Sequence, residues 1–425
     1  MRNLLGLIVG VLLAVNGAAQ TGKVAFRDDG TILTDGKPFF PIGLYYCSEE
    51  IEDASGKLLS RLKDIGFNTL GYYRWGQPAW QKELDRIHQA GMKVWIRGEN
   101  GFAIDTPQIE KAALKQVREI RNHPALLFWE FQDEPILNTV SIEGSRKGYQ
   151  LVKREDPHHP LLVVEWPGAV SRFHLWKGIG DLFATDLYPI PRSRGYGRLP
   201  NHDITQMRDY LEALKKAHGD RPRMLVLQAW NWEPLKYGTS GYPTLVESRF
   251  MAYQAVIHGA KGLHYYGQVH CTRPNSASGL WSEAKDPKVN RQEFEKCLQL
   301  NRRFWDEHKP FFQELARAST IFLLREAEPK LRIVEVKRGK QASATASGIE
   351  FLTKQDGKSI YLLSVNANAK PRTATFQLPT SAQQVAEVHV LFENRTIPVK
   401  NGRFSDDFQA YATHVYATTS ALPRP

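Results

Sequence analysis

The chain has 425 residues, of which 42% are hydrophobic and 24% are charged, so it can bury a large core and is neither a disordered nor a fibrous protein. Its formal charge is +11, but the 56 basic residues are scattered along the chain, which favours a solvated positive surface over a nucleic-acid-binding one. The 3 cysteines are too few for a disulfide scaffold and lack metal-ligand spacing, so we expect no metal and no other cofactor.

The first 19 residues have the layout of a signal peptide. One basic residue precedes an apolar run of about 12 residues, and small residues follow at Gly17 and Ala19. An uncleaved anchor is the alternative, but the run is shorter than the roughly 20 residues that a spanning helix needs. No later segment reaches that length. We therefore expect cleavage near Ala19, a secreted or periplasmic location, and no membrane span.

Short apolar runs and helical patterns alternate along most of the chain. A hairpin pattern with Asp-Gly turns comes first, at residues 24–38. In one of the helical segments, Thr106 and Pro107 supply a cap and a first-turn proline before the periodic apolar residues. The segment at residues 167–180 has the weakest helical pattern. The strand-like runs lie at residues 39–46, 69–74, 93–98, 126–134, 161–166, 182–189, 224–230 and 262–266.

Eight strand-helix units over about 240 residues predict an α/β fold, a (β/α)8 TIM barrel. A doubly wound open sheet is the alternative, but the glycine-rich phosphate loop that it predicts does not occur. From about Thr320 the runs become short, alternating and divided by Gly, Asn and Pro, which predicts a small antiparallel β-sandwich. We therefore assign the barrel with its hairpin to residues 20–318 and the sandwich to residues 319–425.

Polar and aromatic residues gather at the ends of the predicted strands. In such barrels the carboxyl ends of the strands and the loops after them build the active site. Because buried carboxylates with perturbed pKa values gather in clefts, we favour a functional site over a buried hydrogen-bond network that stiffens the barrel. Tyr45, Trp166 and Trp232 also lie at strand ends, and the strand-end residues that we predict to form the site are Arg74, Trp75, Arg97, Glu99, Asp133, Glu134, Glu165, Asp186, Tyr188, Gln228, Trp230 and Tyr266.

Aromatic side chains beside carboxyl groups suit a carbohydrate. Sugars present apolar C–H faces to stack on aromatic rings, and their hydroxyls bond to acids and amides. A glycosidic bond is cleaved by two carboxyl groups in different protonation states. These residues therefore predict a carbohydrate site, with core packing as the alternative for most of the aromatic residues.

The run VREIRNHPALLFWEFQDEP resembles the fourth-strand region of the clan A glycoside hydrolases, which are retaining (β/α)8 enzymes. The resemblance covers residues 39–267, and a C-terminal β-sandwich is common among exported members. It implies that Glu134 is the general acid/base. Two positions depart from the family pattern: Asp133 replaces the usual Asn, and Gln228 occupies the place of the nucleophilic Glu. An amide cannot attack an anomeric carbon as a carboxylate does.

Three interpretations follow from these departures. Another carboxylate at the strand ends (Asp186, Glu99 or Glu165) could act as base or nucleophile, and Asp186 could lie across the bond from Glu134 at the separation of about 6.5 to 9.5 Å that inversion requires. Asp133 and Glu134 also resemble the Asp-Glu pair of hexosaminidases, in which the Asp orients the substrate's acetamido group as nucleophile. The third interpretation is a carbohydrate-binding barrel without activity, a decayed glycosidase. We expect a glycoside hydrolase that acts on an oligosaccharide or polysaccharide, with the first two routes both open.

Two further features suggest details of the site. Arg192, Arg194 and Arg198 follow the sixth strand and, with the arginines at the strand ends, suggest an anionic glycan, although a plain surface loop is equally compatible. Cys47 and Cys271 follow the first and eighth strands, which are neighbours in a closed barrel, so they form either a disulfide or two free thiols. The sequence contains no indication of the oligomeric state.

Overall fold

The computed structural model describes residues 22–45, 47–195, 197–267, 291–328, 331–338, 341–343 and 348–424. The expected signal peptide and Cys271 lie outside these residues, so the export prediction and the Cys47 pairing both stay predictions.

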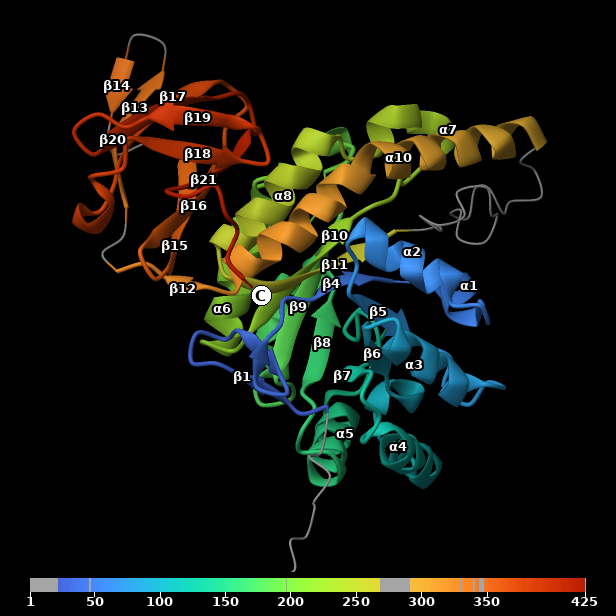
Figure 1. The fold of residues 1–425 in the computed structure, drawn as a ribbon. Coiled ribbons are helices and arrows are strands. Elements are labelled where there is room, and N and C mark those ends of the chain that lie inside the picture. Colours follow the sequence, from blue (N-terminus) through green and yellow to red (C-terminus); the bar gives the residue numbers. More distant parts are fainter. Residues whose placement is uncertain are drawn as a thin grey trace, which may run out of the picture.

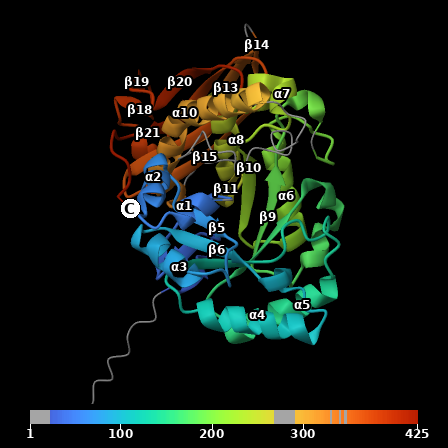
Figure 2. The same cartoon turned by 90° about the vertical axis from the view of Figure 1, so that its right-hand side faces the viewer.

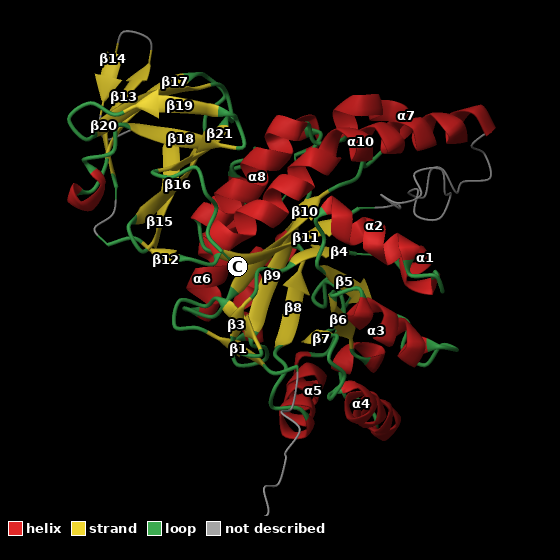
Figure 3. Ribbon diagram, in the orientation of Figure 1, coloured by secondary structure: helices red, strands yellow, loops and turns green. Residues whose placement is uncertain are grey.

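Eight parallel strands close into a barrel, which confirms the predicted fold class (Figures 1 and 3). In chain order each strand pairs with the next, and β11 closes the ring onto β4. Most strands are shorter than their apolar runs, because the last residues of a run already belong to the loop at the barrel mouth, whereas β11 begins two residues before its run. The strands are β4 (Ile42–Leu44), β5 (Thr69–Tyr72), β6 (Lys93–Arg97), β7 (Leu126–Glu130), β8 (Leu161–Glu165), β9 (Leu182–Leu187), β10 (Arg223–Gln228) and β11 (Ala260–Tyr266).

Helices surround the barrel (Figure 3). The α-helices are α1 (Ser48–Glu52), α2 (Lys57–Ile65), α3 (Trp80–Gln89), α4 (Pro107–Ile120), α5 (Ile142–Glu155), α6 (Gln206–His218), α7 (Pro234–Tyr237), α8 (Leu245–Ile257) and α10 (Arg291–Phe322). In α4 the Thr106 side chain accepts a hydrogen bond from Ile109 N, as its capping pattern predicts. Among the described residues, none of these helices has the length and apolar content to cross a membrane.

Some connections are 3₁₀ helices instead of α-helices. The weakly patterned segment after β8 forms η2 (Pro167–Trp176), where Pro167 occupies the first turn and the apolar residues lack a single helical face. The other short helices are η1 (Glu99–Phe102), η3 (Arg192–Arg194), η4 (Gly238–Gly241) and η5 (Thr380–Ala382).

A small N-terminal sheet covers the amino end of the barrel. Strands β1 (Val24–Phe26), β2 (Ile32–Thr34) and β3 (Lys37–Pro38) pair antiparallel, as the Asp-Gly turns predict. Ile32 is fully buried in the cluster that fills the barrel interior. The sheet therefore packs against the interior at the end of the barrel away from the strand-end loops.

The C-terminal region is an antiparallel sandwich, as predicted. One sheet has the order β12-β15-β16-β21-β18-β19 and the other β14-β13-β17-β20, with a separate apolar core between them. The sandwich lies beside α8 and α10, on the opposite side of the barrel from α4 and α5 (Figures 1 and 2). Its strands are β12 (Arg325–Glu326), β13 (Arg332–Arg338), β14 (Gln341–Ser343), β15 (Ile349–Asp356), β16 (Ser359–Asn366), β17 (Arg372–Gln377), β18 (Glu387–Leu391), β19 (Arg395–Pro398), β20 (Arg403–Phe408) and β21 (Thr413–Ala417).

Candidate active site

A cavity of about 340 Å³, here called the mouth cavity, opens where the barrel strands end. Three carboxyl side chains and six aromatic side chains contribute to its wall. It therefore combines the two residue types that the sequence predicted for a carbohydrate site. The lining residues are Tyr45, Asp133, Glu134, Leu137, Val164, Trp166, Asp186, Tyr188, Val226, Trp230, Trp232 and Tyr266.

Asp133 and Glu134 reach the same cavity although they are neighbours in sequence. Along an extended strand, adjacent side chains point to opposite faces. Here the chain leaves β7 after Glu130 and turns, because Glu134 has a φ of 46° in the left-handed region that side chains other than glycine rarely adopt. A backbone hydrogen bond of 3.0 Å from Glu134 N to Val164 O holds this turn against β8. Uncommon backbone conformations of this kind cluster at functional sites.

Glu134 and Asp186 are hydrogen-bonded to each other. Burial raises the pKa of Glu134, the hydrogen bond with Asp186 opposes the shift, and the charge of Asp133 adds to it. Burial also raises the pKa of Asp186 well above its usual range, followed by the charges of Glu134 and Asp133. Such a contact requires a proton between the two groups, because two carboxylates in hydrogen-bond contact repel each other. The raised pKa values therefore favour a proton shared within the pair.

This contact differs from the wide separation that inversion across Glu134 and Asp186 would need. Only β8 lies between β7 and β9, and neighbouring strands are about 4.8 Å apart. The two side chains both extend into the narrow barrel mouth and meet there.

Arg97 forms ion pairs with two further carboxyl groups. Its guanidinium nitrogens lie 3.5 Å from Asp133 Oδ2 and 3.6 Å from Glu130 Oε2. The Tyr45 hydroxyl donates to Glu130 Oε1 at 3.2 Å. Burial raises the pKa of Glu130 to about 7, against the opposing effect of Arg97. Burial likewise raises the pKa of Asp133, and Arg97 again opposes the shift. Arg97 thus partly compensates the negative charge of Glu130 and Asp133.

Aromatic rings form a continuous wall opposite the acids. The Trp230 ring centroid lies 4.4 Å from that of Trp232, 5.4 Å from Tyr266 and 5.5 Å from Tyr188. The Trp232 indole N–H donates a hydrogen bond to the Tyr188 carbonyl at 3.1 Å, which holds the Trp232 ring beside the backbone of Tyr188. Flat rings of this kind match the C–H face of a sugar ring.

Below the cavity, Trp95 and His264 stack with centroids 4.0 Å apart. A side chain at Gly43 or Gly71 would collide with this stack, because a Cβ atom there would approach Trp95 within 2.8 and 2.9 Å. Burial lowers the pKa of His264 to about 3, so its ring is neutral. The two glycines therefore make room for the stacked rings of Trp95 and His264 inside the barrel.

Gln228, at the predicted nucleophile position, does not line the cavity. Its Nε2 donates to the carbonyls of Ile190 at 2.8 Å and Trp230 at 2.9 Å, and its Oε1 accepts from Ile190 N at 2.9 Å. The Gln228 amide thus uses both of its N–H donors and its oxygen to hold the backbone at Ile190 and at Trp230 together. A carboxylate could not make the two donated bonds.

Glu165 also has a structural environment. It is buried, and its Oε1 accepts hydrogen bonds from Ile136 N at 2.8 Å and from the Trp176 indole at 3.0 Å. Burial raises its pKa to about 7, with a small contribution from the charge of Glu134. The side chain holds the loop after Glu134 in place, outside the cavity lining.

Three other predicted substrate-binding residues lie away from the mouth cavity. Arg74 forms ion pairs with Glu52 and Glu83 on the neighbouring helices. The Trp75 indole donates to Glu119 of α4 at 3.2 Å. Glu99 lies at the start of η1, and the cavity wall does not include its side chain.

Other lining residues were not among the predicted site residues. Tyr45, Trp166 and Trp232 are aromatic residues at or just beyond strand ends, where the strand-end criterion already places them, although they were not predicted to bind substrate. Val164 and Val226 gave no such signal, because apolar residues inside barrel strands look the same whether they face a cavity or the core. Within the described part of the chain, no group of three or more His, Cys, Asp or Glu side chains is arranged to hold a metal ion.

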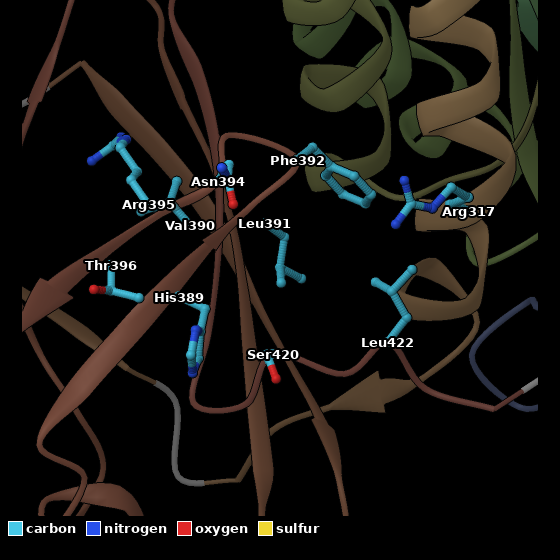
Figure 4. Close-up of a pocket in the computed structure, with 10 residues that line it drawn as sticks. All are labelled: Arg317, His389, Val390, Leu391, Phe392, Asn394, Arg395, Thr396, Ser420 and Leu422. Atoms are coloured by element: carbon cyan, nitrogen blue, oxygen red, sulfur yellow. The ribbon is translucent and has the colours of Figure 1, made fainter.

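A larger hollow of about 680 Å³ lies between α10 and the sandwich (Figure 4). Arg317 on α10 faces Phe392 on the sandwich, with its guanidinium carbon 5.3 Å from the ring centroid. None of the residues that line this hollow carries a carboxyl group. The hollow therefore lacks the groups needed for glycoside cleavage, and the mouth cavity is the candidate active site despite its smaller volume.

No family model and no curated protein matches the chain. Solved structures do share the fold. A glycoside hydrolase family 5 structure from Bacteroides vulgatus ATCC 8482 aligns with a TM-score of 0.57 at 14% identity, over 93% of each chain. An alpha-amylase from Geobacillus thermoleovorans, complexed with acarbose, aligns with a TM-score of 0.53 at 10% identity, over 89% of this chain and 98% of the amylase. At these identities the likeness establishes the barrel-and-sandwich fold.

Proposed function

We propose that this protein is a glycoside hydrolase that cleaves an oligosaccharide or polysaccharide, with Glu134 as the general acid. The observation that carries the proposal is the hydrogen-bonded pair of Glu134 and Asp186 in an aromatic-walled cavity at the barrel mouth. That end of a (β/α)8 barrel is where active sites of this fold lie. The solved structures that share the fold include proteins named as glycoside hydrolases, which agrees with this proposal.

Glu134 supplies the proton in the first step. Burial raises its pKa, which favours the protonated form that a general acid needs, although the hydrogen bond with Asp186 opposes part of this shift. The proton passes to the glycosidic oxygen as the bond from that oxygen to the anomeric carbon breaks. Asp186 is a proton-holding partner: it contacts Glu134 directly and stabilises whichever member of the pair is charged.

Asp133 is the second carboxylate of the proposed mechanism. It lines the cavity beside Glu134; burial raises its pKa, and Arg97 at 3.5 Å opposes this shift and favours the ionised form. An ionised Asp133 either deprotonates a water that attacks the anomeric carbon or orients a substrate acetamido group that attacks it. Attack by water on the face opposite the leaving group inverts the anomeric configuration, whereas attack by the acetamido group leads to retention. Analysis of the first-formed product anomer distinguishes the two.

Gln228 has no nucleophilic role in this proposal. The enzyme therefore does not use the double displacement of the clan A glycosidases, because the amide at that position is committed to backbone hydrogen bonds.

We also propose an exported location, on the basis of the N-terminal sequence pattern alone. For an anionic glycan, the candidate contact is Arg194, whose guanidinium carbon lies 3.8 Å from the centroid of the Trp232 ring in the cavity wall. Other arginines are less suited to this role, because Arg74 and Arg192 each form two ion pairs within the protein. A uronic-acid substrate should lose affinity in Arg194→Gln, whereas a neutral one should not.

The test is hydrolysis of a panel of glycans and aryl glycosides by the native protein and by Glu134→Gln. Loss of a general acid lowers the rate about 10² to 10⁴-fold. Glu110→Gln is the matched control, because it makes the same chemical change at an exposed position on α4. If the native protein binds glycans tightly without turnover, the carbohydrate-binding barrel replaces the hydrolase.

A further inference from the structure

The loop after β9 supplies one wall of the mouth cavity. Tyr188 in this loop lines the cavity, and its carbonyl accepts from the Trp232 indole at 3.1 Å. Two residues later, Ile190 is held through both its N–H and its carbonyl by the Gln228 amide. The cavity wall is therefore attached to β10 on the barrel side.

On its outer side the same loop is attached through Arg192. Its Nη2 lies 2.9 Å from Glu247 Oε1 on α8, and its Nε lies 3.3 Å from Asp203 Oδ1. Its Nη1 donates to the Tyr411 hydroxyl at 3.1 Å, and its guanidinium carbon lies 4.5 Å from the centroid of the Tyr411 ring. We call this set of four residues the Arg192 junction.

Tyr411 belongs to the sandwich, in the connection between β20 and β21. The residue is only 7% exposed, and its ring packs edge-on against Phe250 of α8 with centroids 5.4 Å apart. Its hydroxyl donates to Asp203 Oδ2 at 2.7 Å while it accepts from Arg192. Burial and the bond to Asp203 raise the pKa of Tyr411 to about 12, so the hydroxyl remains protonated and keeps both bonds.

The junction is connected to the cavity rim within the same short helix. Arg192 and Arg194 both belong to η3. Arg194 stacks on Trp232 at 3.8 Å and forms an ion pair of 3.4 Å with Glu233. A displacement of Arg192 would therefore move Arg194, Tyr188 and the Trp232 ring that contacts both of them.

We infer that Tyr411 is a positioning residue of the active site, through which the sandwich fixes the aromatic wall where substrate binds. Tyr411 itself does not line the mouth cavity. Its effect passes through Arg192 to the loop of residues 188–194. The sandwich is then a functional part of the glycosidase and not only a support for the barrel, and this role rests on the function proposed above.

The test compares Tyr411→Phe with Tyr361→Phe in the full-length protein. Tyr361 is a suitable control, because it is a buried sandwich tyrosine whose hydroxyl donates to Ala421 O at 3.0 Å, without a bond to the β9 loop. Both variants lose a hydroxyl, but only Tyr411→Phe loses a bond to a charged guanidinium. We expect Tyr411→Phe to raise KM about threefold to tenfold with kcat changed less than about twofold, since uniform binding is lost. Tyr361→Phe should leave both constants unchanged.

A second experiment measures glycan binding alone, so that it tests the inference without requiring catalysis. The Kd for the glycan is measured with Glu134→Gln and with the double variant Glu134→Gln, Tyr411→Phe, so that no turnover is required. The same threefold to tenfold weakening is expected, because the loss lies in binding. Adding Arg192→Met to Tyr411→Phe should weaken binding less than the sum of the separate effects, since the two residues share an interaction. An equal KM for the native and Tyr411→Phe proteins, with an equal Kd for Glu134→Gln and its double variant with Tyr411→Phe, would overturn the inference. Absent turnover by the native protein would overturn only the proposed hydrolase.

Discussion

Gln228→Glu restores the residue type that clan A glycosidases have at this position, and we expect it to destabilise the protein without creating a nucleophile. The native side chain is 1% exposed and donates to two backbone carbonyls. An ionised carboxylate there would face both carbonyl oxygens, so the introduced group should remain protonated. Holding it protonated at pH 7 against a usual pKa of about 4.3 costs about 4 kcal/mol. The hydroxyl satisfies one carbonyl and leaves the other unpaired, which adds about 1 to 3 kcal/mol.

The assay is urea unfolding of native, Gln228→Glu and Gln81→Glu proteins at pH 5 and pH 7. Gln81 is an exposed residue near the start of α3, so Gln81→Glu introduces the same carboxyl group at a position in contact with solvent. The free energy of unfolding of Gln228→Glu should fall by about 5 to 7 kcal/mol at pH 7 and by about 3 kcal/mol less at pH 5, where protonation is easier. A variant that is as stable as the native protein at pH 7, or that gains hydrolytic activity, would refute the structural role of Gln228.

Two other predictions concern the acids around the cavity. Asp133→Asn removes a negative charge that raises the pKa of Glu134. In the pH profile of the variant's residual kcat/KM, the alkaline limb should therefore move to lower pH. An unmoved limb would argue against Glu134 as the acid. Glu165 has a raised pKa of about 7, so its contribution to stability is present below about pH 4.5 and is lost as the pH rises through 7. Glu165→Gln keeps the acceptor for Ile136 N but cannot ionise. As the pH rises from 4.5 to 8, its free energy of unfolding in urea should therefore increase by about 3 kcal/mol relative to that of the native protein. Parallel pH profiles of the two proteins would contradict the assigned pKa shift.

Much of the fold could be predicted because apolar periodicity reports burial directly. The β7 run is buried at every residue, and the α4 segment has its cap and apolar stripe in the sequence. The 3₁₀ segment η2 was harder to predict, since its structure depends on packing around Trp176 and not on a local repeat. Local patterns thus identified the elements whose stability arises from one buried face.

The candidate site was predictable only in part. Asp133, Glu134 and Asp186 share the cavity because the carboxyl ends of β7 and β9 meet at one rim. Being near a strand end does not fix the direction of a side chain, so Arg74 pairs with Glu83 on the outer helix layer instead. The amide of Gln228 bonds to loop backbone far away in sequence, which no pattern in the chain reveals. The contact between Glu134 and Asp186 likewise depends on the left-handed turn at Glu134.

The most direct measurement is the dependence of hydrolysis on the leaving group. A dinitrophenyl glycoside departs without protonation, whereas an unactivated sugar or alkyl leaving group requires the proton of Glu134. We predict that Glu134→Gln loses about 10² to 10⁴-fold in rate on unactivated substrates and far less on the dinitrophenyl glycoside. An equal loss on both substrates, or full activity of Glu134→Gln on the unactivated one, would contradict the assignment of Glu134 as the general acid.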